Sequence, residues 1–146
     1  MNTNTARITP EHNLFSEVER TMDDIKTDLM STELLSADHR DVERLIETKT
    51  RGLMRELFQA HLDLRAAKEQ KVTVRGADNI ARTAARESTR KLETLFGEVT
   101  VTRQLYQAPG TDGLAPMDAA LNPASGTVLL RDPAIRGGGG GARIVR

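Results

Sequence analysis

Residues Thr89–Gln107, TRKLETLFGEVTVTRQLYQ, form the stretch that decides the fold of this chain. Two β-rich runs, Lys91–Phe96 and Val99–Tyr106, are separated by Gly97-Glu98. Glycine in the first central position of a two-residue loop suits a type II′ turn, so the stretch predicts a β-hairpin. This loop fixes the predicted register, in which Phe96 faces Val99, Thr94 faces Val101 and Leu92 faces Arg103.

The two faces of the predicted hairpin differ in polarity because successive side chains of a strand alternate between faces. One face is apolar and carries Leu92, Phe96, Val99, Val101 and Leu105. The other carries Lys91, Glu93, Thr100, Thr102 and Gln104. Since a lone two-stranded hairpin is marginal in water, we expect the preceding helices to cover the apolar face.

The first half of the chain predicts two helices. A helix start is indicated at Thr9-Pro10, and apolar residues then recur at helical spacing until Met30, namely Leu14, Val18, Met22, Ile25 and Leu29. A short break at Ser31–Ala37, with Ser36 and Asp38 as candidate caps, precedes a longer helix from Asp38 to Lys71. So short a connection predicts an antiparallel helical hairpin. Gly52 inside the longer helix suggests close packing against the first one.

These signals together predict an α+β chain. We expect a flexible N-terminus over 1–9, a helical hairpin over 10–71, a basic segment and β-hairpin over 72–107, and a loop and disordered tail over 108–146. Within the basic segment, Val72–Val74 has strand propensity and Gly76–Asn79 indicates a turn. One helical turn is expected at Pro116–Leu121, and five successive glycines, Gly137–Gly141, favour disorder in the tail.

The composition limits the class of protein. Hydrophobic residues make up 38% of the chain and aromatic residues 3%, so a core must be built mainly from Leu, Val and Met. The chain has no cysteine, which excludes disulfides and thiolate metal sites. It has no apolar run long enough to span a bilayer and no apolar core of a secretory signal near its start. We therefore expect a cytoplasmic protein with no membrane partner.

The sequence offers no convincing catalytic chemistry. His12, His39 and His61 lack ligand-like spacing, and the acidic residues of the first helix fall on the polar side of its apolar stripe. The glycine run lacks the residues of a phosphate-binding loop, and no nucleophile motif is present. We expect no enzyme activity, no catalytic residue, no bound metal and no cofactor.

Charge is unevenly distributed although the net charge is zero. Residues 1–47 hold five Lys/Arg against eleven Asp/Glu, and the remainder holds sixteen against ten. Six basic residues flank the predicted hairpin and are candidates for contact with a DNA backbone: Arg75, Arg82, Arg86, Arg90, Lys91 and Arg103. The alternative is that they only aid solubility or pair with nearby acids, namely Glu87, Glu93 and Glu98.

Three functions are left open by the residues alone. The basic segment favours DNA binding. The apolar stripe of the first helix instead favours a small interaction module that self-associates through its N-terminal helices and never meets DNA. The third reading is a product without function that is degraded.

Several pieces of the sequence, in order and spacing, resemble the N-terminal portion of insertion-sequence transposases of the ISKra4 type, across roughly Val42 to Leu121. They are LMRELFQAHLDLRAAKE (53–69), GAD (76–78) followed by RT (82–83), FGEVTVTR-x-x-Y (96–106), APG (108–110) and MDAALN (117–122). The resemblance implies the front part of a DNA-transposing protein whose catalytic, metal-dependent nuclease-like domain lies downstream and is absent here. It also implies a role in DNA-end binding or multimerisation.

The resemblance stops after Asn122. The chain turns there to Pro-Ala-Ser-Gly and then to polyglycine. A run of GGN glycine codons, read one base along, gives GNG codons for Ala, Val, Glu and Gly, which matches an Ala-Val-Glu-Ala-Ala-Arg-Gly stretch expected from the family at this place. We therefore expect a truncated or frameshifted product, which the nucleotide sequence beyond the Asn122 codon tests directly.

Overall fold

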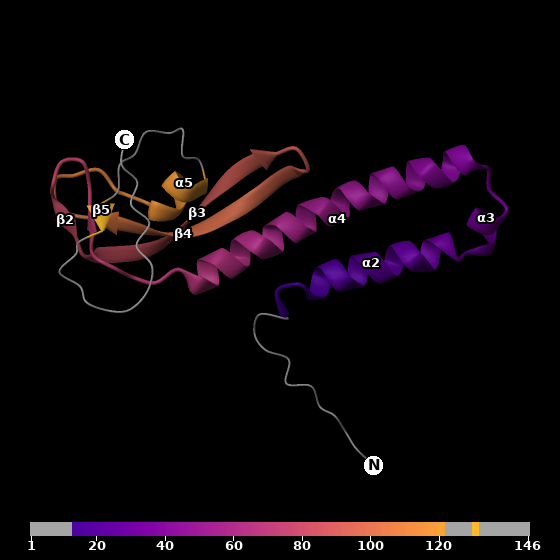
Figure 1. The fold of residues 1–146 in the computed structure, drawn as a ribbon, viewed down its shortest axis with the longest axis horizontal. Coiled ribbons are helices and arrows are strands. Elements are labelled where there is room, and N and C mark those ends of the chain that lie inside the picture. Colours follow the sequence, from indigo (N-terminus) through magenta and orange to yellow (C-terminus); the bar gives the residue numbers. More distant parts are fainter. Residues whose placement is uncertain (1–12, 122–129, 132–146) are drawn as a thin grey trace, which may run out of the picture. The chain divides into compact units, whose positions relative to one another are not determined.

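The computed structural model describes residues 13–121 and 130–131 (Figure 1). The described part is α+β, as the sequence predicted, with helices first and a long β-hairpin after them. It divides into two compact units. Among the described residues, the first contains 13–67 and Lys91–Val101, and the second contains Lys68–Arg90, 102–121 and 130–131.

The first unit begins with the predicted helical hairpin. Helix α2 spans Ser16–Leu29, the single turn α3 spans Thr32–Leu35, and α4 spans His39–Lys68. The predicted start at Thr9-Pro10 and the flexible segment 1–9 lie outside the described residues. Helix α4 ends three residues before Lys71, the end that the sequence predicted.

One of the two capping predictions for the connection between the helices is wrong. Ser31 caps α3, because its Oγ accepts a hydrogen bond from the backbone N–H of Leu34 at 3.3 Å. Asp38 caps α4 as predicted, through a 3.0 Å bond from the N–H of Asp41 to its Oδ1. Ser36 is not an N-cap. It ends α3, and its hydroxyl donates back to the carbonyls of Thr32 and Glu33.

The helices α2 and α4 run side by side and antiparallel in the first unit (Figure 1). Ile25 of α2 is buried, and an ion pair joins Asp28 of α2 to Lys49 of α4. The close packing expected at Gly52 is wrong, because a Cβ added there would meet nothing within 4 Å. The buried positions of α4 lie further along the helix, at Leu53, Ala60 and Leu62.

The β-hairpin is present, but its turn lies two residues earlier than predicted. Strand β3 spans Ala84–Thr94, β4 spans Gly97–Gln107, and the turn is Leu95-Phe96. Thr94 and Gly97 therefore flank the turn, and the predicted register with Phe96 opposite Val99 is wrong. Gly97 is the first residue of β4 and has a φ of +117°, a backbone conformation that glycine adopts without steric cost.

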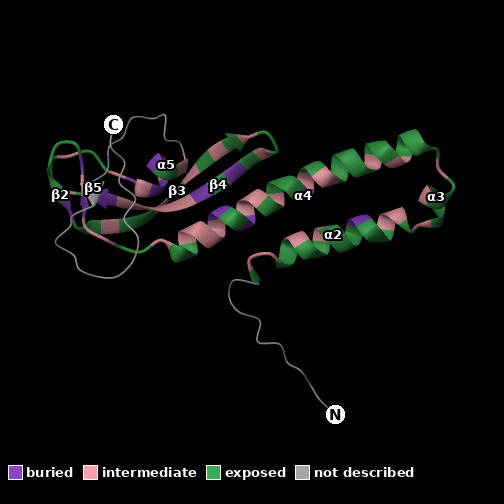
Figure 2. Cartoon of the chain, in the orientation of Figure 1, coloured by how far each residue is buried: buried purple, intermediate pink, exposed green. Residues whose placement is uncertain are grey.

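The predicted assignment of side chains to the two faces of the hairpin is partly correct despite this shift. Val99 and Val101 of β4 are buried and Leu92 of β3 is half-buried, as expected for the apolar face (Figure 2). Phe96 instead belongs to the exposed turn, and Leu105 is only half-buried.

A side-chain amide joins the hairpin to α4 within the first unit. Gln59 of α4 donates from Nε2 to the carbonyl of Thr100 at 2.9 Å and accepts from the N–H of Thr100 at 2.8 Å. The amide therefore satisfies both outward backbone groups of this β4 residue, as a neighbouring strand would. This contact places α4 along the edge of β4, whereas the sequence predicted that a helix covers the apolar face.

The second unit holds a small antiparallel sheet with the strand order β2-β1-β5. Strand β1 spans Val74–Arg75, β2 spans Ala81–Arg82 and β5 spans Leu130–Arg131. The predicted turn at Gly76–Asn79 connects β1 to β2, and Asn79 has a positive φ of 61°. The disorder predicted for the tail is wrong at Leu130–Arg131, which pairs with β1, and the rest of that prediction lies outside the described residues.

Tyr106 organises the core of the second unit. It is 1% exposed, and its hydroxyl accepts from the N–H of Val72 at 3.0 Å and donates to the carbonyl of Gln70 at 3.4 Å. Its backbone exchanges two hydrogen bonds with Leu114, at 2.7 and 2.8 Å. The predicted helical turn is α5, Pro116–Leu121, and it buries Met117 and Ala119.

Candidate functional site

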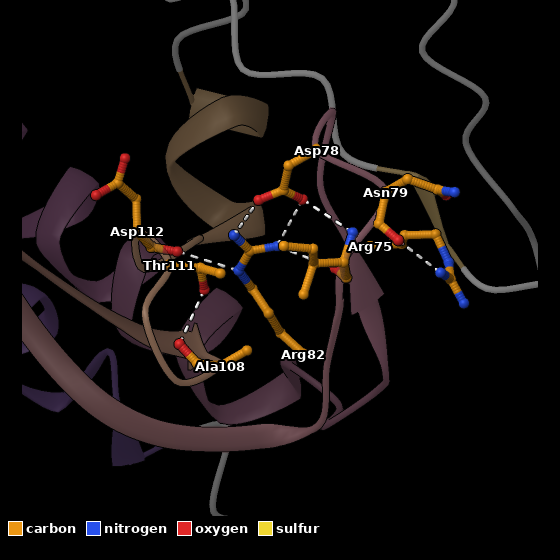
Figure 3. A network of polar contacts seen from close by, with 8 residues as sticks. Arg75, Asp78, Asn79, Arg82, Ala108, Thr111 and Asp112 are labelled. Atoms are coloured by element: carbon orange, nitrogen blue, oxygen red, sulfur yellow. Dashed lines mark hydrogen bonds and ion pairs between the residues drawn. The ribbon is translucent and has the colours of Figure 1, made fainter.

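Arg82, one of the six predicted DNA-contacting residues, is buried in the second unit. Its side chain is 1% exposed, and Figure 3 shows its guanidinium enclosed by acceptors. Nη1 and Nη2 bind the two carboxylate oxygens of Asp78 at 3.0 and 2.6 Å. Nη1 also donates to the carbonyl of Ile80, and Nε to that of Asp112, both at 3.0 Å. With these donors engaged inside the protein, Arg82 is not available to a phosphate in this structure.

The ion pair shifts both partners in the direction that favours the charged forms. The hydrogen bond from Arg82, followed by the N–H of Ile80, lowers the pKa of Asp78 to about 2. The same carboxylate raises the pKa of Arg82. Gly76 leaves room for this pair, because a Cβ there would lie 2.9 Å from Asp78 Oδ1 and 3.0 Å from Arg82 Nη1. The cluster is therefore a structural clamp on the turn between β1 and β2.

Arg90 and Arg103 converge on one carboxylate of α5. Arg90 Nε donates to Asp118 Oδ1 at 2.6 Å, and Arg103 Nε donates to Asp118 Oδ2 at 2.8 Å. Arg103 also reaches Ser88 Oγ at 3.2 Å, and its side chain is only 12% exposed. These two arginines fix α5 to the hairpin strands in the second unit, which leaves them little freedom to bind an external anion.

Of the other three candidates, Lys91 and Arg86 are exposed. Lys91 is an exposed residue that pairs with Glu98 at 2.8 Å, and this carboxylate raises the pKa of the lysine. Arg75 is half-buried and donates to the carbonyl of Asn79 at 2.7 Å. Arg86 is exposed and donates from Nε to Gln107 Oε1 at 3.3 Å.

The structure thus brings together only part of the predicted basic set. Arg90 and Arg103 meet at Asp118, and Arg82 is enclosed elsewhere in the second unit, whereas Lys91 belongs to the first unit. Sequence reasoning missed Asp78 and Asp118 as partners. Of the three glutamates that it named, only Glu98 pairs with one of the six basic residues, Lys91, within residues 13–121 and 130–131.

A second candidate surface is an apolar groove in the first unit, which the sequence did not predict. Helix α4 and the hairpin turn contribute its walls, from Ile46, Glu47, Thr50, Arg51, Met54, Leu95 and Phe96. Leu95 is 89% exposed, and Ile46 and Met54 are 40% and 41% exposed. Glu47 and Arg51 form an ion pair of 3.6 Å at the groove. The exposed Leu95-Phe96 turn was the available signal, but the register error assigned Phe96 to a strand.

The apolar stripe of α2, which the sequence offered for self-association, is partly used inside the first unit. Ile25 is buried, and Leu14, Val18 and Leu29 are half-buried. Met22, at 44%, is the only fully exposed member. Among the described residues of this unit, the large apolar side chain with the highest exposed fraction is instead Leu95 at the hairpin turn, at 89%.

Two further features are absent from the described part of the chain, a metal-binding cluster and a membrane-spanning helix. Among residues 13–121 and 130–131, no group of three or more His, Cys, Asp or Glu residues is arranged to hold a metal ion. No helix in those same ranges combines the length and apolarity needed to cross a membrane.

Comparison with known protein families, curated proteins and solved structures finds no match for this chain. The sequence pieces that carry the family resemblance nevertheless have structural roles. The GAD and RT pieces supply Gly76, Asp78 and Arg82 of the clamp, and Arg103 of one piece binds Asp118 of another. These contacts explain the spacing of the pieces without assigning them to a reaction.

Proposed function

We propose that this chain is a non-catalytic N-terminal portion of an insertion-sequence transposase of the ISKra4 type, and that its role is assembly by self-association. The apolar groove of the first unit is the observation that carries the assembly role. The transposase context rests on the resemblance of the sequence pieces. The contacts among Arg82, Asp78, Arg103 and Asp118 favour assembly over DNA binding, since they occupy arginines that a phosphate would need.

The groove suits a second copy of the same chain. Removing its apolar lining from water lowers the free energy by about 25 cal/mol per Å² of buried apolar surface. Its one acid and one base, Glu47 and Arg51, leave it without net charge and make it complementary to itself. In a two-fold arrangement the same patch meets on both subunits, so Glu47 of each copy faces Arg51 of the other. Leu95, which is 89% exposed, has the largest exposed fraction to bury there among the apolar groove residues.

Leu95→Asp tests this assembly. Light scattering over a concentration series is expected to show that the variant loses the dimer formed through the groove and has a lower average mass than the parent chain, because a carboxylate at that interface loses its hydration. Leu95 is so exposed that the variant should keep its stability to within about 0.5 kcal/mol.

Ile80→Asp is the matched control. Ile80 is 41% exposed, like Met54, but it belongs to the second unit and does not line the groove. It should leave the dimer intact. A parent chain that stays monomeric at every concentration, or equal losses in both variants, contradicts the proposal.

DNA contact is a second candidate because Arg86 is exposed and weakly held. Arg86→Ala and Lys91→Ala, at the two exposed basic candidates, should weaken binding in gel shifts and reduce the slope against salt concentration by about one each, if each side chain contacts a phosphate. Arg40→Ala, an exposed arginine on α4, is the control. Unchanged affinity in the first two variants leaves the interaction module without DNA binding as the function.

A further inference from the structure

Strand β3 has an open edge. It pairs only with β4, and within residues 13–121 and 130–131 none of its backbone groups on the other side has a hydrogen-bond partner. The corresponding edge of β4 is covered, because Thr100 is bound by Gln59, Gln104 by Glu69, and Tyr106 by Leu114. An uncovered edge presents unpaired N–H and C=O groups on which another strand can pair.

The contacts of β4 show which β3 residues point outward. The even-numbered residues Thr100, Gln104 and Tyr106 direct their backbone groups away from β3, so the odd-numbered residues bond to it. Strands of eleven residues each, joined by two residues, place even-numbered β3 residues opposite odd-numbered β4 residues. The hydrogen bond between Ser88 and Arg103 agrees with this register. The outward backbone groups of β3 therefore belong to Ala85, Glu87, Thr89, Lys91 and Glu93.

We propose that the β3 edge pairs antiparallel with the β3 edge of a second copy, in a two-fold register centred on Thr89. This register places Glu87 of each copy directly opposite Lys91 of the other, and Thr89 opposite Thr89. Opposite charges in directly facing positions stabilise a strand pair, and like charges destabilise it. Two hairpins of two strands each then form one sheet of four, which removes the open edge from both.

Neighbouring registers lack this complementarity. Centring on Arg90 places Glu87 opposite Glu93, and centring on Lys91 places two lysines face to face. Centring on Ser88 places Lys91 opposite Ala85 and leaves Glu87 opposite Thr89. The charge pattern therefore selects Thr89 as the two-fold centre. This interface is separate from the groove of the first unit, and neither requires the other.

A single-cysteine experiment tests the register. The chain has no cysteine, so Thr89→Cys introduces the only thiol. Opposed residues of a hydrogen-bonded antiparallel pair have Cα atoms about 5.5 Å apart, which is within disulfide range. Mild oxidation should therefore convert this variant to a covalent dimer. Glu93→Cys, on the same strand and with the same exposure class, is the control, because its two copies lie far apart in this register.

The outcomes separate this proposal from assembly through the groove. Rapid cross-linking at position 89, with little at 93, supports the β3 interface even where Leu95→Asp leaves the mass unchanged. Equal cross-linking at the two positions, or none, overturns it, whatever light scattering shows for the groove.

A charge exchange gives a second readout in the full chain. In Thr89→Cys, adding Glu87→Lys should slow cross-linking roughly tenfold, because both cross-strand pairs become repulsive. Adding Lys91→Glu to that variant should restore the rate. Glu93→Lys, which makes the same change in charge opposite Ala85, should have no effect, and an equal slowing there contradicts the register.

Discussion

Arg82 shows how a charged side chain becomes part of a core. A buried guanidinium is tolerated only where its donors are satisfied. Here Asp78 accepts two of the bonds, and the carbonyls of Ile80 and Asp112 accept the others. Removing the carboxylate would leave a positive charge buried without its counter-charge, which is more costly than losing a surface ion pair.

The pKa of Asp78 makes this clamp sensitive to acid. The folded-state pKa of about 2 lies below the ordinary value of 3.8, so the carboxylate contributes stability above about pH 4 and loses that contribution as the pH falls toward 2. Asp78→Asn should lower the melting temperature by several degrees at neutral pH. The difference from the parent chain should shrink between about pH 4 and about pH 2.

Asp112→Asn is the matched control for this measurement. Asp112 offers its backbone carbonyl to Arg82, and Figure 3 shows its carboxylate directed away from the guanidinium. Thermal melts of the two variants across the same pH series should therefore differ. A constant difference between Asp78→Asn and the parent chain at every pH would show that the carboxylate is not the acid-sensitive group.

Single residues also mark the limit of sequence reasoning about the basic segment. The sequence showed that arginines accumulate in this segment, but it did not show which groups they bind. Asp118 lies 28 residues from Arg90 and 15 from Arg103, so the ion pairs depend on where α5 packs. The spacing of residues within one segment carries no information about such contacts. The sequence therefore suggested the glutamates close in the chain, Glu87, Glu93 and Glu98, as partners.

At the scale of elements, the hairpin could be predicted because its alternation of apolar residues is independent of the turn. The predicted turn is Gly97-Glu98, whereas the turn in the structure is Leu95-Phe96. A shift of two residues preserves the parity of both strands, so Leu92, Val99 and Val101 keep their face although every cross-strand pair changes. The glycine signal was correct about a positive φ, but Gly97 follows the turn rather than opening it.

Gln59 supplies an element-scale prediction, because one amide holds α4 to β4. Gln59→Glu keeps an acceptor for the N–H of Thr100 but replaces the donor to the Thr100 carbonyl, and to Asp63 Oδ1 on the same helix, with an oxygen. The expected cost is about 1–3 kcal/mol in the free energy of unfolding, measured by urea denaturation. Gln107→Glu on β4, whose amide oxygen accepts a hydrogen bond from the exposed Arg86, should cost less than Gln59→Glu. Equal costs would show that the amide pair does not hold the hairpin.

At the scale of the whole molecule, the division into two units was not predictable from the sequence. The predicted boundaries at 71 and 107 followed changes in composition, whereas the units divide the hairpin itself, after Arg90 in β3 and after Val101 in β4. No compositional change occurs at those points, because the hairpin pattern is continuous across them. The shared strands nevertheless have a consequence for unfolding, since each unit depends on residues of the same two strands.

We therefore expect the described part to unfold in one cooperative transition. The only tyrosine, Tyr106, reports on the second unit by its fluorescence, while helical circular dichroism reports mainly on α2 and α4 of the first. Leu62→Ala removes a side chain that is 0% exposed and should cost about 2–5 kcal/mol. If the strands couple the units, both signals shift to the same lower temperature. Leu57→Ala, the same change at a 43% exposed position of α4, should shift them much less. A fall in the helical signal alone, with tyrosine fluorescence unchanged, would mean that each unit unfolds independently despite the strands that they share.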